Sequence, residues 1–202
     1  MSENEMDNKS KMIFLYRHGE TNWNVEDRIT GQLKNANIYF TKHGYEQIEE
    51  ISNSLQENRI EAIFSSDLER AADTANLANK FLHLPVFYSE KIRGLNMGKY
   101  QGLKKDEFIN QENVCKCFAN HSLAIDGGES INALNERMIN FLIEVCKETR
   151  YKRIAVITHS AAISNLKAYL SNNNYVRTNR CVLLYKNNVL SVLEYGINNI
   201  KC

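Results

Sequence analysis

Short runs of apolar residues alternate with longer segments of mixed polarity along this chain of 202 residues. The runs are rich in β-branched and aromatic residues, and their lengths are typical of buried strands rather than of helices. They lie at residues 12–16, 60–64, 86–88 and 154–157. These four runs therefore predict four buried strands.

The segments between the runs have the periodicity of amphipathic helices. In the first three, apolar side chains recur every three or four residues, and a short polar side chain stands where an N-cap is needed. The expected helices cover residues 41–58, 67–82, 130–145 and 160–170. The expected N-caps of the first three are Thr41, Asp67 and Ser130.

Strands that alternate with helices of this length indicate an α/β fold in three layers, with helices on both faces of a mostly parallel sheet. Runs at 181–185 and 189–195 flank Lys186-Asn187-Asn188, which predicts a terminal antiparallel hairpin. Residues 91–128 fit neither period, and we expect a small, partly helical insertion there, over the C-terminal ends of the strands. A flexible tail over 1–11 and one domain over 12–202 complete the predicted organisation.

Composition excludes several classes of function. The 25 basic and 24 acidic side chains nearly cancel, leaving a formal net charge of +1, so the charge excess of a general nucleic-acid binder is missing. No stretch has the about 18 successive apolar residues of a membrane helix, and the first residues do not form a signal peptide. Five cysteines, an odd number, indicate free thiols in a reducing compartment. We expect a cytoplasmic protein that binds neither nucleic acid nor membrane.

Two histidines and two arginines follow the expected strands directly. Arg17 and His18 come after the first strand, Arg70 lies in the first turn after the second, and His159 follows the late strand. Any one of them has an ordinary structural explanation, such as a surface position on a helix. Because the carboxyl ends of parallel strands meet at one edge of a sheet, we expect all four side chains to converge there.

The chemistry of these four residues suits a phosphoryl group. Arginine forks match phosphate oxygens and stay charged at any working pH. A histidine beside two arginines is held neutral by their field and can attack phosphorus. A second histidine, held charged by bound phosphate, would stabilise the phosphoryl oxygens during transfer. The pattern predicts a metal-free phosphoryl-transfer site with histidine as the nucleophile.

Several motifs occur in a fixed order along nearly the whole chain. They are Tyr16-Arg17-His18-Gly19-Glu20-Thr21-Asn22-Trp23-Asn24, Arg28, Thr30-Gly31, Thr41-Lys42-His43-Gly44, Ser65-Ser66-Asp67-Leu68-Glu69-Arg70-Ala71-Ala72-Asp73-Thr74-Ala75, Gly127-Gly128-Glu129-Ser130 and Val156-Ile157-Thr158-His159. Together they resemble the histidine phosphatase superfamily, the phosphoglycerate mutase-like enzymes. The joint pattern is far more specific than any single motif.

The resemblance implies that His18 becomes transiently phosphorylated and that Arg17, Arg70 and His159 form the phosphate pocket. It also implies that no metal or other cofactor takes part, and that the substrate is a small phosphomonoester. Candidates include sugar phosphates, phosphoglycerates and a nucleotide-like ribazole phosphate. Further contacts to substrate oxygens are expected from Asn24, from the backbone near Thr30 and Gly31, and from Glu129.

The short chain resembles the phosphatase branch of the superfamily more than its mutases. Mutases usually carry a richer insertion with basic residues that retain a doubly charged cofactor, and residues 91–128 here contain no arginine pair. We therefore expect water to attack the phosphohistidine. A phosphoglycerate mutase-type phosphotransferase is the alternative enzyme.

Gly94 departs from the superfamily pattern, in which a glutamate at this position protonates the leaving oxygen. Loss of a general acid typically costs about 10²- to 10⁴-fold in rate. One replacement would be another carboxylate. Four are candidates, Glu90, Asp106, Glu107 and Glu129, and Glu129 is the first to test. A substrate with a good leaving group, such as a phosphoramidate, would reduce the need for an acid. A weakly active or inactive protein that binds phosphorylated ligands is the third interpretation.

Overall fold

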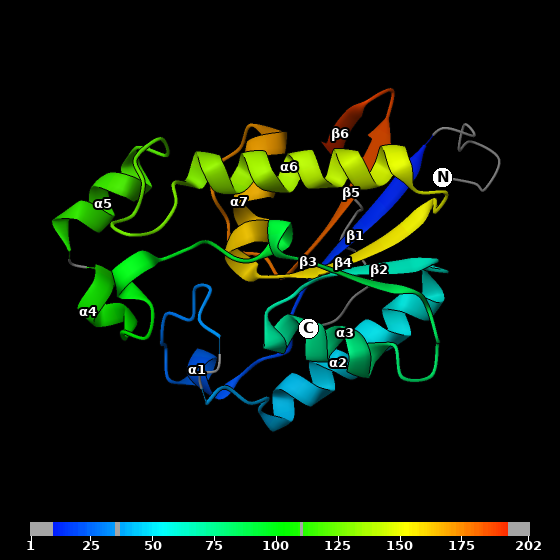
Figure 1. Ribbon diagram of the computed structural model, residues 1–202, viewed down its shortest axis with the longest axis horizontal. Coiled ribbons are helices and arrows are strands. Elements are labelled where there is room, and N and C mark those ends of the chain that lie inside the picture. The colour runs from blue at the N-terminus through cyan, green and yellow to red at the C-terminus, as the bar shows by residue number, and fades with distance from the viewer. Residues whose placement is uncertain (1–9, 35–36, 110, 194–202) are drawn as a thin grey trace.

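The computed structural model describes residues 10–34, 37–109 and 111–193 (Figure 1). Within them, six strands form one sheet in the order β3-β2-β4-β1-β5-β6. β2 pairs in parallel with β3 and β4, β4 pairs in parallel with β1, and the last two strands are antiparallel. The strands are β1 Lys11–Arg17, β2 Ala62–Ser66, β3 Val86–Ser89, β4 Arg153–Thr158, β5 Arg180–Lys186 and β6 Val189–Val192.

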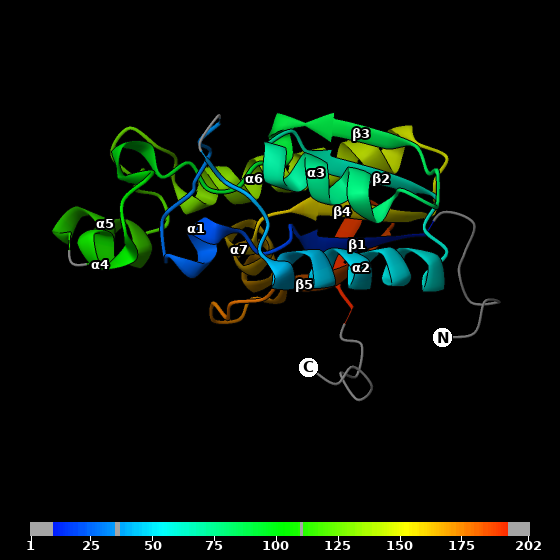
Figure 2. The same cartoon turned by 90° about the horizontal axis from the view of Figure 1, so that it is seen from below.

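Helices cover both faces of the sheet, as Figures 1 and 2 show. α2 and α3 pack on one face, and α6 and α7 pack on the other. The helices are α1 Asn22–Val25, α2 Lys42–Glu57, α3 Glu69–Ala78, α4 Lys105–Ile109, α5 Glu112–Ala119, α6 Ile131–Glu148 and α7 Ser160–Ser171, with short 3₁₀ turns η2 Glu90–Ile92 and η3 Gly98–Tyr100. The predicted three-layer α/β fold is confirmed.

The alternation of side chains along β1 divides the core into two parts. Met12, Phe14 and Tyr16 face α2 and α3, whereas Ile13 and Leu15 face α6 and α7. All five are buried, because a central strand has a helical layer on each side. This explains why the strand is a continuous apolar run.

Two of the three predicted N-caps are confirmed, and the prediction that Asp67 caps a helix is wrong. Thr41 Oγ1 accepts from the N–H of Gly44 over 3.0 Å and caps α2, and Ser130 likewise caps α6. α3 is capped at Leu68 without a side-chain hydrogen bond. The carboxylate of Asp67 instead accepts two hydrogen bonds from Arg93, at 2.6 and 2.5 Å. A bidentate ion pair has replaced the cap.

The predicted helix over 67–82 ends earlier than expected, at Ala78. The side chain of Asn79 donates to the backbone oxygen of Leu84 over 2.8 Å and accepts from its N–H over 2.9 Å. An asparagine that pairs with the backbone of a turn in this way competes with continuation of the helix.

The hairpin between β5 and β6 turns at Asn187 and Asn188, both with positive φ, of 52° and 62°. Two such residues suit the tight turn of an antiparallel hairpin, and asparagine tolerates this region. The part of the predicted run after residue 193 lies outside the described residues, as do residues 1–9 of the predicted tail. The region 91–128 is partly helical, as expected, and extends beyond the end of the sheet (Figure 1). No helix among the described residues is long and apolar enough to span a bilayer.

Candidate active site

Three strand ends meet at one edge of the sheet. β1 and β4 are adjacent and parallel, and Arg17 is paired with Thr158. His18 and His159 therefore leave neighbouring strands at the same level, with ring centroids 5.2 Å apart and planes at 65°. Arg70 comes from the first turn of α3, directly after β2. The structure thus brings together the residues that the sequence places at separate strand ends.

The imidazole of His18 is held in one tautomer. Its Nδ1 lies 2.8 Å from the carbonyl oxygen of Gly19, which can only accept, so Nδ1 carries the proton and donates. Burial, followed by the charges of Arg70 and Arg17, holds the pKa of His18 well below its usual 6.5. The ring is therefore neutral at physiological pH, and Nε2 keeps the lone pair that a nucleophile needs.

The first turn of α2 fixes the loop that follows His18. The N–H of Glu20 donates to Oε1 of Gln47 over 2.9 Å, and the N–H of Thr41 donates to the Glu20 oxygen over 3.1 Å. Gly44 approaches so closely that a Cβ there would lie 2.1 Å from the same oxygen. A glycine is needed for this contact, which explains the glycine of the Thr41-Lys42-His43-Gly44 motif.

Arg70 is buried and bridges two sides of the site. Its Nη2 donates to the carbonyl oxygen of Gly31 over 2.7 Å and to Nδ1 of His159 over 3.2 Å. Burial, followed by the charge of Arg17, lowers the pKa of Arg70 to about 10, so the guanidinium stays charged near neutrality. Nε has no hydrogen-bond partner among the described residues. A buried cation with an unused N–H suits an anion.

His159 is neutral in this arrangement. A guanidinium cannot accept a hydrogen bond, so Nδ1 of His159 accepts from Arg70 and the ring proton is on Nε2, 3.0 Å from Oγ of Ser66. Burial, followed by the charge of Arg70, lowers the pKa of His159 well below 6.5. The sequence predicts a charged His159 in the complex with phosphate. That form therefore requires the bound phosphate to offset the effects of burial and of Arg70 on the pKa of His159.

A cavity of about 330 Å³ opens over these groups. It is lined by Arg17, His18, Arg70 and His159, and by the expected substrate contacts Asn24, Thr30 and Gly31. The backbone at Gly31 has a φ of +51°, and a Cβ there would lie 2.2 Å from the side chain of Gln101. This position therefore favours glycine, and its carbonyl is the acceptor that orients Arg70.

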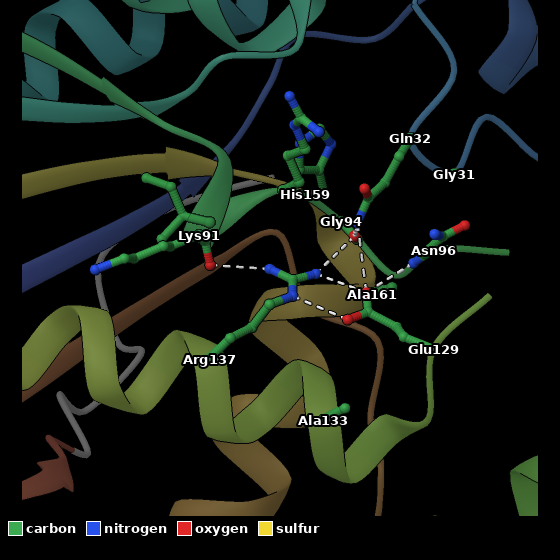
Figure 3. A network of polar contacts seen from close by, with 12 residues as sticks. Gly31, Gln32, Lys91, Gly94, Asn96, Glu129, Ala133, Arg137, His159 and Ala161 are labelled. Carbon is green, nitrogen blue, oxygen red and sulfur yellow. Dashed lines mark hydrogen bonds and ion pairs between the residues drawn. The ribbon is translucent and has the colours of Figure 1, made fainter. Parts of the chain in front are cut away.

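Glu129, by contrast, does not belong to the described lining of the cavity. Its carboxylate accepts two hydrogen bonds from Arg137, at 2.7 and 2.9 Å, and one from the N–H of Asn96, at 2.8 Å (Figure 3). The same guanidinium donates to the carbonyl oxygens of Gly94 and Lys91, each over 2.9 Å. The geometry gives Glu129 a structural role, in place of the expected substrate contact or proton donor.

Gly94 lies on the wall of the cavity, where the superfamily pattern places its acid. A Cβ at this position would point at His159, 3.1 Å from its Cβ and Cγ (Figure 3). A longer side chain at position 94 would therefore start directly beside the second histidine.

The sequence model of the histidine phosphatase superfamily (branch 1) matches residues 13–202. The chain belongs to this superfamily. It is 32% identical over 160 residues to phosphoglycerate mutase-like protein 4 of Arabidopsis thaliana, covering 76% of this chain and 68% of that one. It is 34% identical over 157 residues to a metal-independent phosphoserine phosphatase of the same plant, covering 75% of this chain and 65% of that one.

Solved structures of proteins named as phosphatases share the fold. A mycobacterial glucosyl-3-phosphoglycerate phosphatase, in a structure with VO₃, superposes with a TM-score of 0.74 at 23% identity, over 86% of this chain and 90% of that one. An α-ribazole phosphatase from Shigella flexneri superposes with a TM-score of 0.75 at 22% identity, over 90% of this chain and 94% of that one. At this level of identity the likeness concerns the fold alone.

Three cations on the wall of this histidine phosphatase site were not predicted from the sequence as site residues. They are Arg28, Lys105 and Arg177, from the segment after α1, the start of α4 and the segment before β5. Arg177 follows an asparagine-rich stretch that carries only loop signals, so no spacing pointed to it. Among the described residues, no group of three or more His, Cys, Asp or Glu side chains is arranged to hold a metal ion.

Proposed function

We propose that this protein is a histidine phosphatase that hydrolyses a small phosphorylated substrate through a phosphohistidine on His18, without a metal. The observation that carries the proposal is the fixed tautomer of His18, which leaves Nε2 unprotonated on a residue that lines the same cavity as Arg17, Arg70 and His159. A relative named as a metal-independent phosphoserine phosphatase supports this class of reaction.

The geometry suggests how the steps are divided. Arg17 and the free Nε of Arg70 bind phosphoryl oxygens, which places phosphorus opposite Nε2 of His18. Nε2 forms a bond to phosphorus while the bond to the leaving oxygen breaks. His159, once its pKa is raised by the bound anion, donates to a phosphoryl oxygen. Water then attacks the phosphohistidine, which returns His18 and releases phosphate.

A mutase activity is the second candidate, because a relative is named phosphoglycerate mutase-like. In a mutase, the phosphohistidine would pass its phosphoryl group to another position of the substrate rather than to water. The modest region 91–128, without an arginine pair, favours the phosphatase.

The test is turnover of p-nitrophenyl phosphate by the purified protein in the presence of a chelator, with His18→Asn as the control. We expect turnover by the wild type, a mass increase of one phosphoryl group after a rapid quench in denaturant at alkaline pH, where the N–P bond survives, and neither with the variant. Phosphate or vanadate binding without turnover would replace the proposal by a phospho-ligand binding protein. Interconversion of 2- and 3-phosphoglycerate faster than phosphate release would establish the mutase.

We also infer a cytoplasmic location, and that neither nucleic acid nor a membrane is a partner. Cys115, Cys117, Cys146 and Cys181 are free thiols in the structure, which is typical of proteins from reducing compartments.

A further inference from the structure

The wall of the active-site cavity carries more positive charge than one phosphoryl group requires. Besides Arg17 and Arg70, it contains Arg28, Lys105 and Arg177. We call these last three the outer cations. The charge of Arg177 is felt inside the site, since burial and then Arg177 lower the pKa of Arg17. The cavity is therefore built for an anion larger than a single phosphate.

Two of the outer cations form ion pairs with carboxylates, and the carboxylates hold the two cations in place. Arg28 Nε lies 2.7 Å from Glu26, and Lys105 Nζ lies 2.5 Å from Asp27. Arg177 is exposed, and its charge acts on Arg17 rather than on an acidic partner in the described part of the chain. Arg177 is thus the outer cation best placed to gain a new anionic partner.

The described lining of the same cavity contains no carboxyl group. Asp67, the nearest acid to the end of β2, is paired with Arg93, and that ion pair lowers its pKa to about 2, so it carries no proton at neutral pH. Glu129 is occupied by Arg137. Position 94, which faces His159, is a glycine.

An alkoxide is a poor leaving group without a proton, because the pKa of the corresponding alcohol lies far above the physiological range. A carboxylate, with a pKa of about 4, or a phosphate, with a second pKa of about 6, departs as an anion. Cations aimed at the developing charge then replace the acid as the stabilising group.

We propose that this enzyme acts on phosphoanhydrides or acyl phosphates, and that the outer cations, Arg177 above all, bind the leaving group as it departs as an anion. The proposal rests on the proposed phosphatase function and names its substrate class. Nε2 of His18 forms the N–P bond, the P–O bond breaks, and its electron pair leaves with the carboxylate or phosphate, unprotonated. Water then adds to phosphorus, the N–P bond breaks, and dihydrogen phosphate is released with both protons of the water.

The experiment compares leaving groups on the wild-type enzyme, after subtraction of uncatalysed hydrolysis. The substrates are p-nitrophenyl phosphate, acetyl phosphate, pyrophosphate and glycerol 2-phosphate. We expect kcat/KM for acetyl phosphate or pyrophosphate to exceed that for glycerol 2-phosphate by about 10²-fold or more, the factor that a general acid supplies. The faster of the two identifies the leaving group. Values within tenfold of glycerol 2-phosphate would overturn the proposal, whereas no turnover of p-nitrophenyl phosphate would overturn the phosphatase function itself.

Variants separate the role of Arg177 from a general effect of charge. Arg177→Gln should lower kcat/KM for the preferred anionic substrate about tenfold or more, and should lower that for p-nitrophenyl phosphate less. The matched control is Arg150→Gln, an exposed arginine that contacts Tyr151 in the segment between α6 and β4, and we expect no change with it. An equal loss on both substrates with Arg177→Gln would contradict the assignment.

Tyr175 also lines the cavity, and its phenol is a candidate donor of a proton in addition to the charged His159 of the phosphate complex. With Tyr175→Phe, the ratio of acetyl phosphate to glycerol 2-phosphate turnover should not rise. A selective loss of glycerol 2-phosphate turnover would show that a general acid is present and would overturn the proposal.

Discussion

Arg70 donates a hydrogen bond from Nη2 to Nδ1 of His159 over 3.2 Å. This contact is possible only while His159 is neutral on that nitrogen, so the cation and the imidazole are coupled. A bound anion would draw Arg70 toward itself and would favour the charged imidazole, because its negative charge offsets the positive charges that, after burial, lower the pKa of His159. Binding of a phosphoryl group and protonation of His159 are therefore expected to accompany each other.

The lowered pKa values of His18 and His159 predict how stability depends on pH. Below pH 6.5 the unfolded chain binds protons on both residues and the native protein does not, so the free energy of unfolding rises with pH up to about 6.5 and then levels off. Each histidine contributes a slope of up to about 1.4 kcal/mol per pH unit. Urea unfolding between pH 5 and 7 measures it. His18→Asn should reduce the slope, and an unchanged slope would show that His18 is not buried in the neutral form.

Gly31→Ala is expected to damage both stability and activity. The left-handed backbone at this position costs an L-residue about 1 to 2 kcal/mol, and the added methyl would collide with Gln101. Because the Gly31 carbonyl anchors Arg70, kcat/KM should fall as well.

The matched control for this variant is Gly127→Ala. Its φ is also positive, at +72°, but the nearest atoms to a new Cβ lie at 3.7 Å or beyond. Both variants carry the backbone strain, but only Gly31→Ala adds the clash with Gln101. The difference between their thermal unfolding temperatures therefore measures the cost of the clash. Equal losses of stability, or an unchanged kcat/KM for Gly31→Ala, would contradict this account.

Gly94→Glu should speed hydrolysis of an alkyl phosphate much more than that of an aryl phosphate. The new side chain would start 3.1 Å from His159 and, after a shift of a few tenths of an ångström in that ring, would place a carboxyl group inside the cavity. We expect a gain of about tenfold or more for glycerol 2-phosphate, at the lower end of what a general acid supplies. Gly94→Gln, which has the same shape without the proton, should give no such gain. A similar effect of both variants would show that position 94 cannot deliver a proton.

Removal of Arg137 is expected to destabilise the protein more than removal of a surface cation. The Arg137 and Glu129 side chains are only 22% and 17% exposed, and Arg137→Met would leave this carboxylate unpaired. Loss of one partner from such a partly buried pair costs on the order of 2 kcal/mol or more. Lys91→Met, which breaks the exposed pair with Glu144, should have a much smaller effect. Denaturant unfolding of both variants gives the comparison.

Much of the fold follows from the sequence because its signals are local. The apolar run at 12–16 became a strand buried on both faces, and Asn187 and Asn188 turn the hairpin with the backbone that their type tolerates. The convergence of His18 and His159 was also predictable, since parallel strands deliver their ends to one edge.

The remaining features depend on partners that are distant in sequence. Asp67 has a good side chain for a helix N-cap, yet Arg93, 26 residues later, provides two charge-assisted hydrogen bonds and wins the competition. Glu129 is held by Arg137 from within α6, and no spacing rule distinguishes that contact from a place in the cavity. Arg177 enters the site from an irregular segment that has no periodicity to interpret.

The pairing of β1 with β4, from Met12 opposite Arg153 to Arg17 opposite Thr158, makes the chemistry sensitive to chain length. Successive residues of a strand advance by about 3.3 Å and alternate between faces. One codon inserted into or deleted from either strand would turn its apolar side chains toward the wrong layer and separate the two imidazoles. Exchanges among aliphatic residues at Leu15 or Val156 would preserve their spacing. Evolution of this protein can therefore vary the composition of these two strands far more freely than their number of residues.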